Sequence, residues 1–107
     1  MDEEVTCTAP LWRWTGGNGG AWHFLGITGE TAEVLAGTAL MRRLEGLGRG
    51  FGSLRVRATI GETTWETSVF PHRSGRTAAE WILPVKAAVR KAEGLEEGDE
   101  AVLTLRF

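Results

Sequence analysis

Several groups able to bind an anion gather in the second half of the chain. The segment Phe70–Arg76 carries an imidazole, two guanidiniums and a hydroxyl, and Lys86 and Arg90 follow it near the second expected helix. A guanidinium binds a carboxylate or phosphate through paired N–H donors, and an imidazole titrates near neutral pH. We therefore identify a candidate anion- or ligand-binding set, made of His72, Arg73, Arg76, Lys86 and Arg90. The alternative is that residues 71–76 form an ordinary solvated loop with no ligand.

The distribution of charge allows a local basic surface on an acidic protein. The formal net charge is −2, which argues against a general binder of polyanions. Residues 51–92 hold seven Arg or Lys against three Glu, a balance of +4, whereas residues 93–107 hold five acids against Arg106, a balance of −4. The helix start expected at Pro84–Lys86 adds backbone N–H groups that favour an anion at the same place.

Signatures of catalysis and of metal binding are weak. Ser74 and His72 are too close in sequence to specify a catalytic triad, and no G-x-S-x-G elbow surrounds Ser74. Cys7 with His23 or His72 would make a nucleophile pair, but a buried, inert thiol in the first strand is the better interpretation. Two scattered histidines and one cysteine do not form a metal site. The sequence therefore predicts no cofactor and no metal, and it favours a binding domain over an enzyme.

Five tryptophans are many for a chain of 107 residues. Exposed indole rings provide stacking surfaces for bases or sugars, whereas core packing is the default role of tryptophan in a small barrel. We expect Trp22, Trp65 and Trp81 to be mostly buried. Trp12 or Trp14 is the better candidate for exposure.

The first half of the chain predicts a hairpin followed by a helix. Val5–Trp14 and Trp22–Ile27 have the character of strands, and the glycine-rich segment between them supplies a hairpin loop. Thr28 offers an N-cap, and apolar residues at helical spacing follow it, although Gly37 weakens the prediction of one continuous helix. The apolar residues are Ala32, Val34, Leu35, Leu40, Met41 and Leu44.

The second half predicts another hairpin, then a strand, a helix and a last strand. Apolar residues alternate cleanly along the first strand of a hairpin over residues 53–70, whose turn is Gly61-Glu62. A loop over Pro71–Arg76 leads to a strand over Ala79–Leu83. Pro84 suits the first turn of a helix that Gly94 ends, and the chain finishes in a strand over Ala101–Phe107.

Two segments of the chain share a pattern. Arg42–Gly50 and Arg90–Gly98 both read basic-basic-x-Glu-Gly-Leu-x-x-Gly, and each precedes an expected strand. Trp22 and Trp81 begin similar strands upstream. Chance similarity of short glycine turns is the alternative. A true repeat implies a mainly β fold with two helices, in which two related halves close a barrel within one chain.

Size and composition indicate how many domains the protein has and where it is found. The chain has the length of one domain, so we expect residues 1–107 to form a single β-barrel domain. Apolar runs are too short to span a bilayer, and an acidic start argues against a secretory signal. One cysteine forms no internal disulfide. These features together predict a cytoplasmic protein with no membrane partner.

Motifs along nearly the whole chain resemble the family called domain of unknown function 1905. The motifs are Gly20–Phe24, Gly50–Val56, Ile60-Gly61, Trp65–Pro71, Leu83–Lys86 and Gly94–Asp99. The resemblance implies a small double-split β-barrel and no defined activity, and it implies that this chain is a stand-alone version of a domain that some relatives join to a second one.

The segment Leu83–Asp99 also resembles the half-barrel of AbrB/MazE-type DNA-binding proteins. Those proteins build the barrel from two chains, so the resemblance does not carry their DNA surface over to a barrel closed within one chain. The expected function is binding of a small anionic ligand or a protein, by a monomer or weak dimer. A nucleic-acid binder using Arg55, Arg57, Arg73 and Arg76, and an enzyme with an unrecognised site, remain as alternatives.

Overall fold

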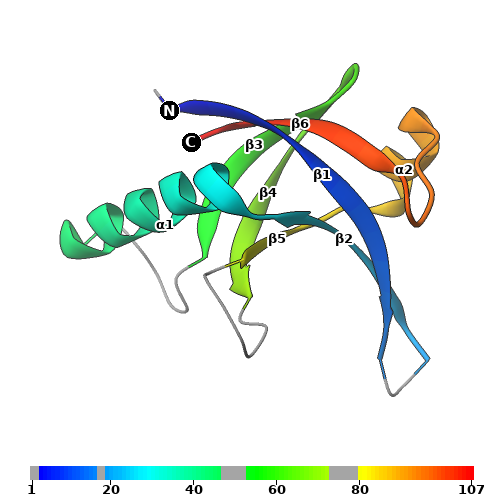
Figure 1. Cartoon of the computed structure of the whole chain (residues 1–107), viewed down its shortest axis with the longest axis horizontal. Helices are drawn as coiled ribbons and strands as arrows, with labels where there is room; N and C mark the ends of the chain where they lie inside the picture. Colours follow the sequence, from blue (N-terminus) through cyan, green and yellow to red (C-terminus); the bar gives the residue numbers. More distant parts are fainter. Residues whose placement is uncertain (1–2, 17–18, 47–52, 73–79) are drawn as a thin grey trace.

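The protein is described by a computed structural model over residues 3–16, 19–46, 53–72 and 80–107. Six strands close into a barrel in the order β1-β2-β5-β4-β3-β6, and every neighbouring pair is antiparallel (Figure 1). The fold is therefore mainly β with two helices, as predicted. The elements are β1 Glu4–Thr15, β2 Ala21–Ile27, α1 Gly29–Leu44, β3 Leu54–Ile60, β4 Thr63–His72, β5 Glu80–Pro84, α2 Ala87–Glu93 and β6 Glu100–Arg106.

The hairpin of β3 and β4 follows directly from its sequence. The apolar residues of β3 alternate with arginine and threonine, and all of them are buried. Gly61 occupies the left-handed region at φ 57°, as the two-residue turn between Ile60 and Thr63 requires. The β4 strand continues to His72, so the expectation that Pro71 and His72 belong to a loop is wrong. Pro71 and His72 belong to β4 because it pairs there with Trp81 and Glu80 of β5.

The first strand bends and takes part in two sheets. Its residues Glu4–Pro10 pair with β6, and Leu11–Thr15 pair with β2. Glu3 and Phe107 exchange backbone hydrogen bonds, so both ends of the described chain meet on one side of the barrel (Figure 1). The core is one cluster of apolar side chains that includes Leu11, Leu25 and Leu105.

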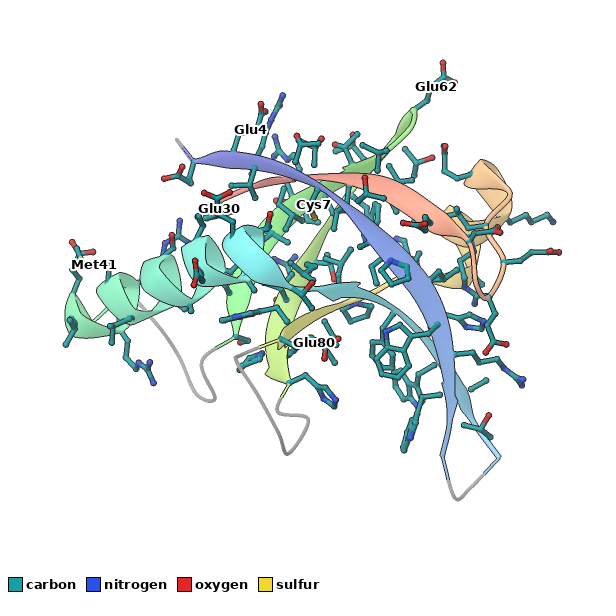
Figure 2. The ribbon with its side chains drawn as sticks, in the orientation of Figure 1. Glu4, Cys7, Glu30, Met41, Glu62 and Glu80 are labelled. Carbon is teal, nitrogen blue, oxygen red and sulfur yellow. The ribbon has the colours of Figure 1, made fainter. Side chains whose placement is uncertain are left out.

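The α1 helix runs without interruption from Gly29 to Leu44, through Gly37. Thr28 is its N-cap residue, although its side chain makes no capping hydrogen bond. Three helix residues enter the core: Ala32, Leu35 and Ala39. The apolar residues Leu40, Met41 and Leu44 belong to the helix as predicted but are exposed, because the second half of α1 extends beyond the barrel wall (Figure 2).

The α2 helix begins at Ala87, three residues later than predicted. Pro84 is the last residue of β5 and lies opposite Phe24 of β2. The Val85 N–H still donates to the His23 carbonyl at 2.9 Å, which holds the backbone extended past Pro84. The predicted end is confirmed: Gly94 is left-handed at φ 62°, and the Leu95 N–H donates to the Arg90 carbonyl at 2.9 Å.

The strand order has an internal symmetry. If β1, β2 and β3 are exchanged with β4, β5 and β6, every neighbouring pair of the barrel is reproduced. Each half also has a helix between its second and third strands. This arrangement is the one that two related halves would produce, whereas the sequence repeat itself stays a prediction. None of the helices in the described residues is long and apolar enough to cross a bilayer.

Candidate functional site

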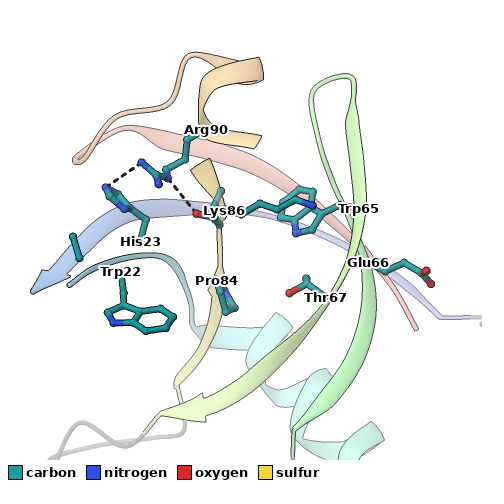
Figure 3. Close-up of a pocket in the computed structure, with 10 residues that line it drawn as sticks. Trp22, His23, Trp65, Glu66, Thr67, Pro84, Lys86 and Arg90 are labelled. Atoms are coloured by element: carbon teal, nitrogen blue, oxygen red, sulfur yellow. Dashed lines mark hydrogen bonds between the residues drawn. The ribbon is translucent and has the colours of Figure 1, made fainter. Parts of the chain in front are cut away.

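A pocket of about 270 Å³ opens where β4 separates from β5 and α2. The two strands pair only from Phe70 and Ile82 onward toward His72, whereas β4 itself runs back to Thr63. The wall of the barrel is therefore split between the middle of β4 and the β5–α2 junction. The pocket lies in this split and takes its lining from β2, β4, β5 and α2 (Figure 3).

Arg90 of α2 is held in place at one wall of the pocket. Its Nε donates to the Val85 carbonyl at 3.2 Å, and its NH1 lies 3.5 Å from Nε2 of His23. These two contacts use only part of the guanidinium, because arginine has five N–H donors. The remaining donors are available to a ligand, and the side chain needs little ordering to bind it.

Lys86 and two residues of β4 complete the polar lining. Lys86 precedes α2, and its exposed side chain reaches toward Trp65 across the pocket (Figure 3). Thr67 turns its hydroxyl toward the opening, whereas the Glu66 carboxylate points away from it (Figure 3). Glu66 instead faces Arg57 of β3, with 3.8 Å between the nearest charged atoms. The pocket therefore presents cationic groups above an apolar floor.

The surroundings of His23 favour its neutral form. Burial lowers the pKa of His23, Arg90 and Arg13 lower it further, and only Glu97 acts in the opposite direction. Because Arg90 can only donate, a neutral imidazole that accepts from it at Nε2 carries its proton on Nδ1. His23 thus offers a further donor beside the two cations.

The predicted anion-binding set is only partly brought together. Lys86 and Arg90 line the same pocket. His72 lies on the outer face of β4, where its ring centroid is 6.3 Å from that of Trp12. Arg73 and Arg76 lie outside the described residues, as does Ser74. The function of the set stays a prediction.

The tryptophans divide between the core and the surface. Trp65 and Trp81 are buried and Trp14 is exposed, as expected. The expectation for Trp22 is wrong, since 55% of its surface is exposed and it forms the outer lip of the pocket. Trp22 lies opposite Trp14 in the β1–β2 register, so the two indoles share the outer face of the hairpin.

Three residues that line the pocket were not predicted from the sequence: Trp22, His23 and Thr67. A signal for His23 was present, because it has the same strand parity as the buried Leu25 and Ile27 and therefore faces inward at the barrel end. Because successive residues of a strand face opposite sides, the neighbouring Trp22 faces outward. Only the pairing of β2 with β5 brings these residues next to Lys86 and Arg90.

The other predicted groups lie away from the pocket. Cys7 of β1 is half-buried; burial raises the pKa of its thiol, and a hydrogen bond with Thr31 partly opposes this. This environment agrees with an inert thiol. Across the described ranges, no three His, Cys, Asp or Glu side chains gather as metal ligands would.

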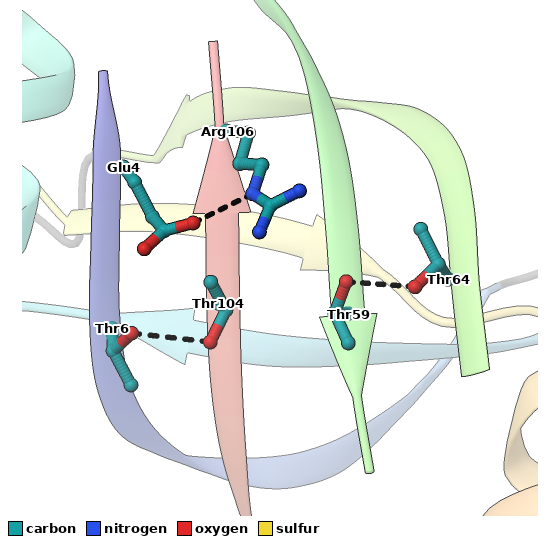
Figure 4. A network of polar contacts seen from close by, with 6 residues as sticks. All are labelled: Glu4, Thr6, Thr59, Thr64, Thr104 and Arg106. Carbon is teal, nitrogen blue, oxygen red and sulfur yellow. Dashed lines mark hydrogen bonds and ion pairs between the residues drawn. The ribbon is translucent and has the colours of Figure 1, made fainter. Parts of the chain in front are cut away.

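Of the arginines assigned to nucleic-acid binding, Arg55 and Arg57 lie on the outer face of β3, where acids and hydroxyls accompany them, whereas Arg73 and Arg76 lie outside the described residues. Arg57 faces Glu66, and Arg106 of β6 bonds Glu4 at 2.6 Å (Figure 4). Hydroxyl pairs extend across the same face, joining Thr6 to Thr104 and Thr59 to Thr64. Arg55 shares this face, opposite Ser68. The surface is therefore balanced in charge rather than basic.

Comparison with known proteins agrees with the resemblance seen in the motifs. No curated protein matches the chain. The family model described as domain of unknown function (DUF1905) matches residues 8–105, which include all six strands and both helices apart from the outermost residues of β1 and β6. The chain, a small closed β-barrel, therefore belongs to the DUF1905 family.

Proposed function

We propose that this barrel is a binding domain whose pocket takes an organic anion, a carboxylate or phosphate attached to a flat apolar group. The observation that carries the proposal is the position of Lys86, Arg90 and His23 around one opening lined by Trp22 and Trp65. Cationic donors select the acidic group, and the indole rings provide apolar area at low conformational cost. The volume of about 270 Å³ is slightly below the range typical of small-molecule sites, which favours a small ligand.

The charge arrangement favours a compact anion over a polyanion. Two of the arginines on the β3–β6 face have carboxylate partners, whereas no carboxylate bonds Lys86 or Arg90 within the described residues. A nucleic acid would need a continuous basic path along its backbone. As part of the same proposal we assign the domain to the cytoplasm, because its one cysteine is half-buried and unpaired.

Calorimetric titration with a panel of aryl carboxylates and aryl phosphates tests the proposal. We expect binding to the unmodified protein and a loss of about tenfold or more in affinity in Arg90→Gln, because charge-assisted hydrogen bonds contribute about 1.5–3 kcal/mol. Lys86→Gln should weaken binding less than Arg90→Gln does. The flexible lysine side chain loses conformational freedom when it contacts the ligand, and this loss offsets part of its attraction.

Lys91→Gln is the matched control. Lys91 follows Arg90 on α2 and carries the same charge as Lys86, but it does not line the pocket. It should bind the panel as the unmodified protein does. Equal affinities in Arg90→Gln and Lys91→Gln, or no binding of any compound, would contradict the proposal.

A further inference from the structure

The split beside the pocket leaves one edge of β4 without a partner strand. Ile60 and Thr63 close a two-residue turn, so they form a hydrogen-bonded pair, and Trp65 and Thr67 follow as the next bonded positions toward β3. The backbone groups of the alternate residues, Thr64, Glu66 and Ser68, therefore point away from β3. On that side β4 pairs with β5 only over Phe70–His72, and the described chain provides no strand opposite residues 64–68.

The corresponding edge in the first half lies beside a longer helix. There β1 pairs with β6 over Glu4–Pro10 and with β2 only beyond that, and α1 contacts β1, as α2 contacts β4 in the second half. This helix has 16 residues and buries three of them, whereas α2 has seven and buries only Val89. Covering an edge with a helix is a common way to protect it. The short α2 leaves the pocket open beside Trp65, Glu66 and Thr67 of the β4 edge.

Both ends of the accessible edge are closed. At one end, the Thr63 hydroxyl donates to the Glu93 carboxylate at 2.6 Å, which fixes the end of α2 against the β3–β4 turn. At the other end, β5 pairs with β4 from Phe70 and Ile82 onward. A strand passing through the split would have to displace both of these closures, whereas the last residues of a chain can enter from the pocket opening.

The charge at the opening determines whether the amino or the carboxyl terminus of a peptide can enter. Lys86 and Arg90 line it, and Arg13 acts on His23 from β1. Cations repel an α-ammonium group and bind an α-carboxylate. The accessible edge spans five residues, about 17 Å at the rise of a strand. That length accommodates the last few residues of an extended peptide.

We propose that the split binds the carboxyl-terminal residues of a partner protein as an added strand on β4, with the terminal carboxylate at Arg90 and Lys86. This inference rests on the proposed anion site and specifies its occupant. Main-chain hydrogen bonds to Thr64, Glu66 and Ser68 would provide affinity, and Trp22 and Trp65 would contact apolar side chains near the terminus.

The test combines a peptide library with amide hydrogen exchange measured by NMR. The probes are N-acetylated pentapeptide pools with random residues and a free carboxyl terminus, together with the same pools amidated at the carboxyl terminus. In the unbound protein, the Glu66 amide should exchange much faster than the Trp65 and Thr67 amides on the same strand. A free-acid pool should bind, amidation should weaken binding at least tenfold, and the bound peptide should slow Glu66 exchange at least tenfold.

The outcomes separate this inference from the proposed function. If aryl carboxylates bind through Arg90 but free-acid peptides bind no better than amides, the peptide inference fails and the anion site stands. Strong protection of the Glu66 amide in the unbound protein would also overturn the inference. If neither aryl anions nor peptides bind, both proposals fail. Arg90→Gln should lose the free-acid preference, and Lys91→Gln, as the control, should keep it.

Discussion

Arg90 and His23 illustrate how single residues can organise a binding site. The guanidinium donates to a carbonyl on its own segment and approaches an imidazole from β2, so α2 and β2 are joined through one side chain. The same contacts orient the remaining donors toward the opening. A lysine at position 90 would supply the charge but not this fixed orientation.

The titration of His23 gives a prediction about pH. Arg90 and Arg13 face this imidazole from α2 and β1, and Glu97 faces it from the turn after α2. The pKa of His23 is lower in the folded protein than the usual value of about 6.5 in the unfolded chain. At a pH near or below about 6.5, the imidazole therefore binds a proton more readily in the unfolded chain than in the folded protein. Protonation therefore favours unfolding, and this contribution is absent at higher pH.

We expect the free energy of unfolding to fall between pH 7.5 and pH 5.5 by more in the unmodified protein than in His23→Gln. Urea denaturation at both pH values measures the difference. A bound aryl carboxylate should reverse the effect, since it stabilises the charged imidazole. Identical pH dependence in the two proteins would contradict the assignment.

At the scale of elements, Gly26 leaves room for the Trp12 side chain of β1 on the outer face of β2. A β-carbon at Gly26 would lie 3.0 Å from Oε1 of Glu80 and 3.3 Å from Nε1 of Trp12. The absence of a side chain lets the Trp12 indole lie across the outer face of the sheet, with its ring centroid 5.6 Å from that of Phe24. Gly37 differs, because a β-carbon there meets nothing within 4 Å.

These two glycines should respond oppositely to alanine. Gly26→Ala should lower the free energy of unfolding by about 1 kcal/mol, because Glu80 and Trp12 must move. Gly37→Ala should raise it by about 0.5–1 kcal/mol, because alanine is a better helix former in an open position. Chemical denaturation of both variants measures the changes, and a shift of the same sign in both would contradict the model of these contacts.

The elements also show where sequence reasoning succeeds and where it fails. Strict alternation placed all the inward residues of β3, and Gly94 marked the end of α2, because both signals are local. Pro84 was assigned to a helix because its own preferences fit that position, whereas pairing with Phe24 decides its conformation. The pocket depends on four elements far apart in sequence, so only Lys86 and Arg90, which lie close together in the chain, were found in advance.

At the scale of the whole molecule, β6 closes the barrel by pairing with β1 on one side and β3 on the other. Leu105 lies fully buried between these strands, and Val102 on the same strand is 61% exposed. Leu105→Ala should lower the free energy of unfolding by about 2–5 kcal/mol. Val102→Ala should change it by no more than about 0.5 kcal/mol. Denaturation by urea measures both, and similar losses would contradict this account of closure.

The position of Trp22 and Trp65 at the pocket has a practical consequence. Indole emission depends on the polarity around the ring, so a ligand that covers the exposed Trp22 should shift the intrinsic fluorescence of the protein. Trp81 and the other tryptophans away from the pocket provide a constant background, and a Trp22→Phe variant would show which part of the signal comes from the opening. The domain thus carries its own unlabelled reporter of occupancy, suited to screening compounds and peptides in solution.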